Sequence, residues 1–226
     1  MTISISIPPW SGTLWPKNSC HLGWAQPGSG GLATYALVAA YILSPIAAGM
    51  FVLAALLEAI YCKLAGVTHL KFLVSGAMVG VGALAGWIAM TSEVRLLEFA
   101  LVFLWMAAWE MGGRNITNDF ADIEEDERLG VKTVPLVYGP KAAAFLTLAL
   151  ILLTNGAALA LTLVSHLNIA CLVGMAAAGL LLLLLPALKL IVSPTPQNAL
   201  SLFNRASFYP PVALAVLIVS LYLPFY

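Results

Sequence analysis

The stretch AAAGLLLLLLPAL, residues 176–188, contains no charged side chain, and its apolar residues would cover every face of a helix. A helix needs about 20 such residues to cross a lipid bilayer. The stretch lies within an apolar run over residues 168–190. Five further runs of this kind are found at residues 33–60, 72–91, 96–113, 142–165 and 207–226. The sequence therefore predicts six membrane-spanning helices.

The composition of the whole chain indicates the same class of protein. Of its 226 residues, 62% are apolar and 9% are charged, which is more apolar material than one soluble core could bury. Strands of a transmembrane β-barrel would alternate polar and apolar residues, and the runs above do not. We predict an all-α, polytopic transmembrane bundle. Residues 1–30 would form an irregular N-terminal segment, and residues 31–226 would form one transmembrane domain.

Basic residues are unequally distributed between the two sides that alternating helices would create. The loops at 61–71, 114–141 and 191–206 fall on one side. They and the adjoining helix ends carry Lys63, Lys71, Arg114, Arg128, Lys132, Lys141, Lys189 and Arg205. The other side has only Lys17 and Arg95. Because cytoplasmic loops are enriched in Lys and Arg, we predict that the first set is cytoplasmic and that both termini lie opposite. For the run at 96–113, which starts beside Arg95, an interfacial helix is the alternative.

Acidic residues are concentrated in one short segment. Six of the ten carboxylates in the chain fall within nine positions, namely Asp119, Asp122, Glu124, Glu125, Asp126 and Glu127. On a regular helix, Asn115, Asp119, Asp122 and Asp126 would share a sector of about 60°. Carboxylates this close repel each other unless a cation neutralises them. Oxygen ligands suit Mg²⁺ or Mn²⁺, and Mg²⁺ commonly completes its shell with substrate phosphate.

The basic residues beside this segment suit a diphosphate. Arg114, Arg128 and Lys132 could take up phosphate charge, with arginine the better bidentate partner. The simpler interpretation is a solvated charged face or a topological anchor. Topological anchoring, however, uses Lys and Arg, and Glu124 and Glu127 point away from the face that carries the aspartates. We therefore favour a metal and diphosphate site.

A long motif supports this interpretation. Residues 114–135 read RNITNDFADIEEDERLGVKTVP and are followed by Tyr138 and Gly139. The pattern NDxxDxxxDxxxGxKTxP after an apolar helix resembles the second aspartate-rich motif of the UbiA-type intramembrane prenyltransferases. The resemblance extends over about residues 35–225. Members of that family join an isoprenoid diphosphate to an aromatic or other acceptor in a bundle of nine helices, with two aspartate-rich loops that bind Mg²⁺.

The resemblance implies roles for individual residues. Asn118, Asp119, Asp122 and Asp126 would hold metal, and Lys132 would contact phosphate. The segment with Tyr61, Lys63 and Lys71 resembles a loop that supplies the family with a further tyrosine and lysine, although both lysines could equally be membrane anchors.

Two further features of the sequence could belong to the site. Glu110, near the end of an apolar run, is a candidate for lining the site. The glycines of GAMVGVGALAG, residues 76–86, would allow close packing or leave room for an isoprenoid tail.

The chain also departs from the family pattern. No Asp or Glu precedes Glu58, so the first aspartate-rich motif is absent, and the chain resembles helices four to nine of the nine. We predict Mg²⁺-dependent prenyl transfer to a lipophilic acceptor within the membrane, with prenyl diphosphate, the acceptor and lipid as partners and no nucleic acid. The alternatives are a truncated or degenerate homologue that binds diphosphate without turnover, and a non-enzymatic protein such as a cation transporter.

Overall fold

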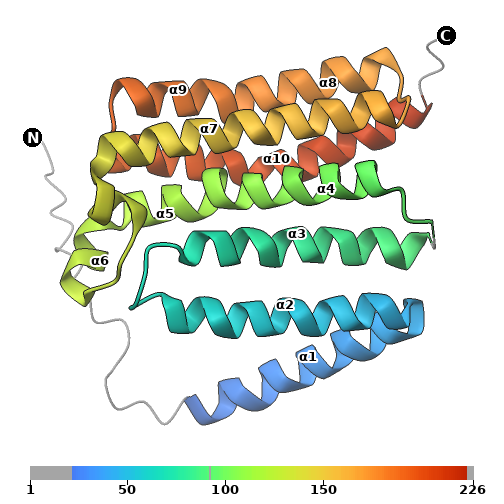
Figure 1. Cartoon of the computed structure of the whole chain (residues 1–226), viewed down its shortest axis with the longest axis horizontal. Helices are drawn as coiled ribbons and strands as arrows, with labels where there is room; N and C mark the ends of the chain where they lie inside the picture. The colour runs from blue at the N-terminus through green and yellow to red at the C-terminus, as the bar shows by residue number, and fades with distance from the viewer. Residues whose placement is uncertain (1–21, 92, 223–226) are drawn as a thin grey trace, which may run out of the picture.

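A computed structural model describes residues 22–91 and 93–222, with side chains from residue 30 onward. Every regular element in this part of the chain is helical (Figure 1). The elements are α1 (Leu22–Leu43), α2 (Pro45–Leu64), α3 (Lys71–Met90), α4 (Leu96–Trp109), the π-helical turn η1 (Glu110–Asn115), α5 (Ile116–Ala121), α6 (Ile123–Leu129), α7 (Val134–Val164), α8 (Ile169–Gly179), the π-helical turn η2 (Leu180–Leu184), α9 (Leu185–Val192) and α10 (Pro196–Tyr222).

Six helical stretches are long and apolar enough to cross a membrane. They are Pro45–Leu64, Lys71–Met90, Leu96–Ala121, Val134–Val164, Ile169–Val192 and Pro196–Tyr222. The predicted all-α class and the number of spans are thereby confirmed. The third of these stretches runs for 26 residues, which favours a spanning helix over an interfacial one.

The first predicted run, residues 33–60, is not one helix. The chain turns at Ser44, and α1 and α2 lie antiparallel (Figure 1). Ser44 caps α2 by accepting a hydrogen bond from the Ala47 amide at 3.4 Å, and Pro45 lacks the amide that a continuous helix would need. The prediction of a single helix was wrong because it weighed hydropathy above this serine and proline.

The start of the chain also differs from the expectation. Helix α1 begins at Leu22, so residues 22–30 are helical and not irregular. Because α1 is antiparallel to α2, its beginning points toward the end of the bundle where α6 lies (Figure 1). The end of α10 lies at the opposite end of the bundle. The first 21 residues, which carry the prediction for the N-terminus, lie outside the described part of the chain.

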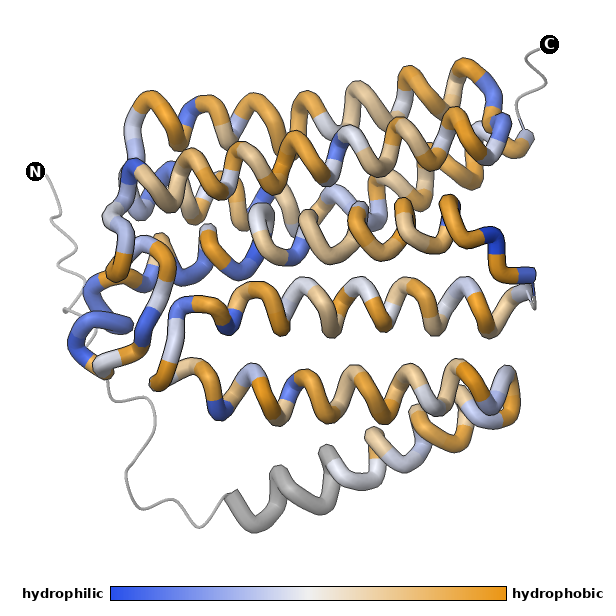
Figure 2. The backbone as a smooth tube through the Cα atoms, viewed as in Figure 1, coloured by the Kyte–Doolittle hydropathy of each residue, from blue (hydrophilic) through white to orange (hydrophobic). Residues whose placement is uncertain are grey.

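The helices pack in two groups that place polar residues at one end. Helices α1 to α4 lie side by side in chain order, and α7 to α10 pack beyond α4 (Figure 1). The largest fully buried side chains include Phe120 in α5, Ile151 in α7, Leu183 in η2, and Leu202 and Tyr209 in α10. Figure 2 shows hydrophilic residues gathered where α5 and α6 lie. The acidic segment is therefore positioned at one end of an apolar bundle.

The glycines of α3 serve two different faces. A Cβ atom on Gly76 would lie 2.5 Å from Cγ of Met111, and one on Gly80 would lie 2.6 Å from the ring of Phe103. These two glycines permit close packing against α4 and η1. Gly82 and Gly86 have open space beside them and line an apolar cavity of about 250 Å³ between α1, α2 and α3. Close packing is thus present at Gly76 and Gly80, while Gly82 and Gly86 leave space between helices.

Replacing Gly112 with alanine is expected to destabilise the bundle by about 1–3 kcal/mol, the usual cost of overpacking a core. The new Cβ would lie 2.7 Å from Cβ of Leu150 and 3.2 Å from the carbonyl oxygen of Thr147. Gly86→Ala is the matched control, since nothing lies within 4 Å of its Cβ position. Thermal unfolding in detergent compares the variants. Equal melting temperatures for the two would contradict the packing of η1 against α7.

Candidate functional site

The acidic segment is broken into short helices. After η1 and α5, the chain leaves helical geometry at Asp122, with φ −100° and ψ 17°, and α6 follows. Gly130 ends α6 with φ 70°, a left-handed conformation that glycine adopts without strain. The prediction that four site residues share the face of one regular helix was therefore wrong in detail. The breaks instead let α6 fold back toward the start of α3.

A buried ion pair lies at the centre of the site. Nζ of Lys71, in the first turn of α3, is 2.9 Å from Oδ1 of Asp119 in α5, and both side chains are buried. The same ammonium group lies 5.7 Å from the ring centre of Tyr61. The Tyr61 hydroxyl accepts a hydrogen bond from Nδ2 of Asn115 at 3.1 Å. Four elements, α2, α3, η1 and α5, thus place a tyrosine, a lysine, an asparagine and an aspartate together.

Three buried oxygens around this ion pair fit a cation. Within the described residues, Oδ1 of Asn115, Oδ2 of Asp119 and Oδ2 of Asp126 have no hydrogen-bond partner. Buried polar atoms are almost always paired, and unpaired carboxylate and amide oxygens are the ligands that Mg²⁺ takes. No group of three or more His, Cys, Asp or Glu side chains in the described chain could hold a metal ion. A cation here would therefore also need amide, water or substrate oxygens.

Asp126 is in an environment that disfavours its charge. Burial raises the pKa of the Asp126 carboxyl. The positive charge of Lys71 opposes this shift, while the negative charges of Asp122 and Glu125 add to it. A carboxylate held under these conditions gains from a nearby cation.

A polar cavity of about 180 Å³ opens beside the ion pair. Its lining comes from α2, η1, α5 and α10, and consists of Tyr61, Glu110, Arg114, Asn115, Asn118, Asp119 and Phe203. The guanidinium of Arg114 lies 4.2 Å from the ring centre of Phe203 and donates a hydrogen bond to Ser207. The cavity combines a cation, carboxylates and amides, which is a chemical environment suited to a metal-bound phosphate group.

Other predicted residues lie outside this cavity. Asp122 is exposed, accepts a hydrogen bond from Asn118 at 3.1 Å, and faces a separate cleft of about 390 Å³ with Glu124 and Glu125. Arg128 is exposed and pairs with Glu125. The structure thus separates these two residues from the ion pair, although Asn118 links Asp122 to the cavity.

Lys132 and Lys63 are also exposed and do not line the cavity. The backbone amide of Lys132 donates to the carbonyl oxygen of Ala65 at 3.3 Å, which connects the acidic segment to the turn between α2 and α3. Of the two lysines near Tyr61, it is Lys71 and not Lys63 that reaches the aspartates.

Sequence reasoning missed several residues of the site. Phe203 and Ser207 come from α10 and contact Arg114, whereas Arg205 in the same helix is exposed. Ser75 donates a hydrogen bond to Oε1 of Glu110 at 2.8 Å. Ser75 could have been predicted to face the site, because it lies four residues after Lys71 and residues four apart share a face of a helix. The sequence offers no comparable signal for Phe203.

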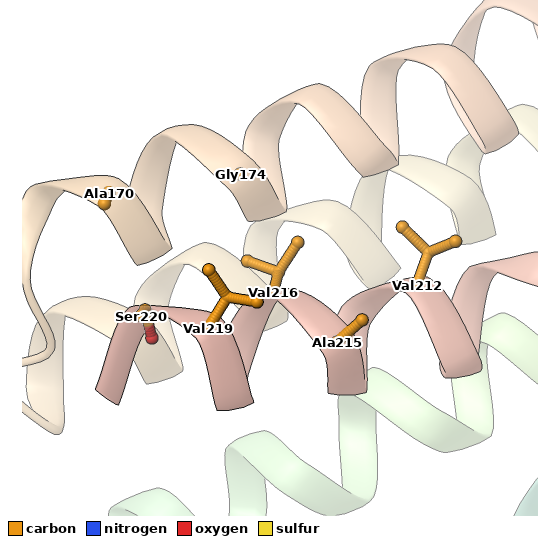
Figure 3. Close-up of a pocket in the computed structure, with 7 residues that line it drawn as sticks. All are labelled: Ala170, Gly174, Val212, Ala215, Val216, Val219 and Ser220. Carbon is orange, nitrogen blue, oxygen red and sulfur yellow. The ribbon is translucent and has the colours of Figure 1, made fainter. Parts of the chain in front are cut away.

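An apolar groove of about 340 Å³ lies between α8 and α10. Figure 3 shows Val212, Val216 and Val219 projecting from α10 toward the helix that carries Gly174. The one hydroxyl group in its lining belongs to Ser220 and donates to the carbonyl oxygen of Leu217 in the same helix. The groove has no charged group that could take part in a reaction, so the polar cavity is the stronger candidate.

Comparisons with known proteins agree with the fold and the motif. A family model described as the UbiA prenyltransferase family matches residues 25–223. A solved structure of a digeranylgeranylglyceryl phosphate synthase has a TM-score of 0.70 and 22% identity, covering 89% of this chain and 71% of that one. An apo structure of a UbiA homologue from Aeropyrum pernix K1 has a TM-score of 0.68 and 21% identity, with coverages of 90% and 74%. No curated protein matches.

Proposed function

Because the chain belongs to the UbiA prenyltransferase family, and is therefore a prenyltransferase of the membrane, we propose how its site works. It would take a prenyl group from an isoprenoid diphosphate and pass it to a small lipophilic acceptor, aromatic or otherwise, with Mg²⁺ or Mn²⁺ bound. The observation that carries this proposal is the set of three unpaired buried oxygens beside Lys71. Without a cation, these three oxygens would remain buried with no partner, which is energetically unfavourable.

The residues of the cavity would hold the diphosphate as it departs. A metal ion bound by Asn115, Asp119 and Asp126 would supply charge stabilisation to the leaving oxygens. Lys71 holds Asp119 in position through its ion pair, and Arg114 is held between Phe203 and Ser207 as a cation in the cavity wall. Fixed charges of this kind stabilise developing negative charge without having to reorganise.

The position of the site suits a substrate that is polar at one end and apolar at the other. The cavity lies where α5 and α6 gather the hydrophilic residues, and the apolar helices extend away from it (Figure 2). A diphosphate would lie at the polar end, and the isoprenoid tail would extend among the helices, where few water molecules could reach a carbocation. Eight basic residues at this end favour a cytoplasmic orientation. Exposed Lys132, Arg128 and Lys63 would assist by attracting the diphosphate.

The second candidate function is diphosphate binding without turnover. It is favoured by one observation, which is that no Asp or Glu precedes Glu58, so the described site contains one cluster of acidic residues. The two solved structures above are longer than this chain, which covers 71% and 74% of them. A site with fewer ligands would bind metal and diphosphate more weakly.

Release of diphosphate from geranylgeranyl diphosphate by the purified chain in liposomes is expected to require Mg²⁺ or Mn²⁺. The assay would supply a panel of lipophilic phenols and naphthols as acceptors, and prenylated product would be detected by mass spectrometry. Removing the metal with EDTA should abolish release, because the carboxylates would then repel the diphosphate, and added Mg²⁺ should restore it. Binding without product would support the second candidate, and neither binding nor product would contradict both.

A further inference from the structure

Glu110 is a carboxylate within a membrane-spanning stretch, Leu96–Ala121. Ionisable groups at such positions are costly and commonly mark a functional cavity. Glu110 lines the same polar cavity as Asp119 and is only partly buried. Its Oε1 accepts a hydrogen bond from Ser75 at 2.8 Å. Ser75 thus fixes one oxygen of the carboxylate in a wall of the cavity.

The π-helical turn η1 explains how Glu110 reaches the cavity. Residues five apart on a regular α-helix differ in direction by about 140°, given 100° per residue, so Glu110 and Asn115 would face different neighbours. The wider turn at Glu110–Asn115 brings both of them to one cavity. Such turns are frequent at functional sites, and here the turn adds a carboxylate to a cavity that already contains amides and Asp119.

No ion pair in the described structure includes Glu110, although Arg114 lies near enough to act on its charge. Four ion pairs are present in that part of the chain, and none includes Glu110. Arg114 lines the same cavity, but its guanidinium is engaged with Phe203 and Ser207. Lys71 is paired with Asp119. Glu110 is therefore a carboxylate that faces the cavity with a hydroxyl donor as its only hydrogen-bond partner among the described residues.

We propose that Glu110 accepts the proton that the acceptor loses during prenyl transfer. The inference rests on the proposed function. An electron pair of the acceptor forms the new bond to the first carbon of the prenyl group, the bond from that carbon to oxygen breaks, and its electrons leave with the diphosphate. The proton released from the hydroxyl or ring carbon of the acceptor passes to Glu110.

The positions of the two carboxylates along the spanning stretch suit this division of roles. Glu110 is the first residue of η1, and Asp119 follows nine positions later in α5. Glu110 lies on the side toward the middle of the spanning stretch, and Asp119 lies near its polar end. The proposal assigns the metal and the diphosphate to Asp119 and the acceptor to Glu110, in two parts of one cavity.

Glu110→Gln tests the proposal because it keeps the shape of the side chain and removes its ability to take a proton. Turnover of geranylgeranyl diphosphate with the phenol and naphthol panel is expected to fall about 100-fold or more, the usual contribution of a general base. The Michaelis constant for the prenyl diphosphate should stay within about threefold, because proton transfer does not change diphosphate binding. Glu110→Asp, which retains a carboxylate, should keep more activity than the glutamine variant.

Glu98→Gln is the matched control. Glu98 is a buried carboxylate in the same spanning stretch, near its start and beside Arg95. Replacing it should leave turnover unchanged. Unaltered turnover in Glu110→Gln, or an equal loss of prenyl diphosphate binding, would overturn the role of Glu110 as a proton acceptor. If the unchanged chain binds prenyl diphosphate but forms no product, the proton-transfer role fails while diphosphate binding stands. If it does not bind prenyl diphosphate at all, the proposed function fails as well.

Discussion

Asp119→Asn is expected to lower metal-dependent turnover of a prenyl diphosphate by roughly 1,000-fold. Asp119 contributes one of the three unpaired buried oxygens and shares the cavity with Arg114 and Asn118. Charge stabilisation by a bound metal is worth several kcal/mol, and each ~1.4 kcal/mol corresponds to about a factor of ten in rate. The measurement is the rate of diphosphate release across a range of Mg²⁺ concentrations, which should also show weaker dependence on the metal.

Glu127→Gln is the control for this change. Glu127 lies in the same acidic segment but is exposed and does not line the cavity, so the variant removes an equal charge from the surface alone. Its turnover should stay within about twofold of the unchanged chain, since exposed charges contribute little. Similar activity in the asparagine and glutamine variants would show that the segment acts only through its net charge, and would contradict a specific site.

Lys71→Met is expected to lower the free energy of unfolding by about 3–5 kcal/mol, the usual cost of leaving one member of a buried ion pair without its partner. Lys71 and Asp119 are both buried and lie 2.9 Å apart. Methionine would fill a similar volume, but the Asp119 carboxylate would remain buried without a neutralising charge. Denaturant unfolding in detergent micelles, followed by circular dichroism, measures the loss. Lys63→Met, at an exposed lysine in α2, should change stability little.

The double variant Lys71→Met, Asp119→Asn separates a lost contact from a stranded charge. If the penalty comes from the unpaired carboxylate, removing that charge should recover most of the stability while turnover stays low. A double variant that is less stable than Lys71→Met would contradict this explanation, and would indicate that the lysine stabilises the bundle through packing of its chain alone.

Much of the fold follows from hydropathy, because lipid imposes length and composition on a spanning helix. The six spans were predictable for that reason. The break at Ser44 was less so, since apolar side chains continue through it, although Pro45 after a serine is a recognisable start for a helix. The position of the acidic segment at one end of the bundle also followed from the sequence, because a cluster of carboxylates cannot remain in hydrocarbon.

The arrangement within the site was harder to predict. The sequence around a loop lysine does not distinguish a residue that anchors a helix at the membrane surface from one that pairs with a distant carboxylate. Lys71 is of the second kind, because it pairs with Asp119, 48 positions away. Only tertiary packing distinguishes it from Lys63. A helical wheel also assumes a regular helix, and the departures at η1 and at Asp122 rotate the residues on either side. The motif indicated which residues to propose for the site, but their relative directions depend on these breaks.

The π-helical turn at Glu110–Asn115 also affects how this chain is compared with distant relatives. In a π-helical turn, backbone hydrogen bonds join residues that are five positions apart, whereas in an α-helix they join residues four apart. Such a turn is therefore equivalent to an α-helix with one inserted residue. Some relatives could have a regular helix at this place. An alignment without gaps would then pair the correct residues on one side of the turn only, and the residues on the other side would be paired one position out of register. Equivalent residues on the two sides of Glu110 should therefore be assigned from superposed backbones, with a single-residue gap allowed inside the helix.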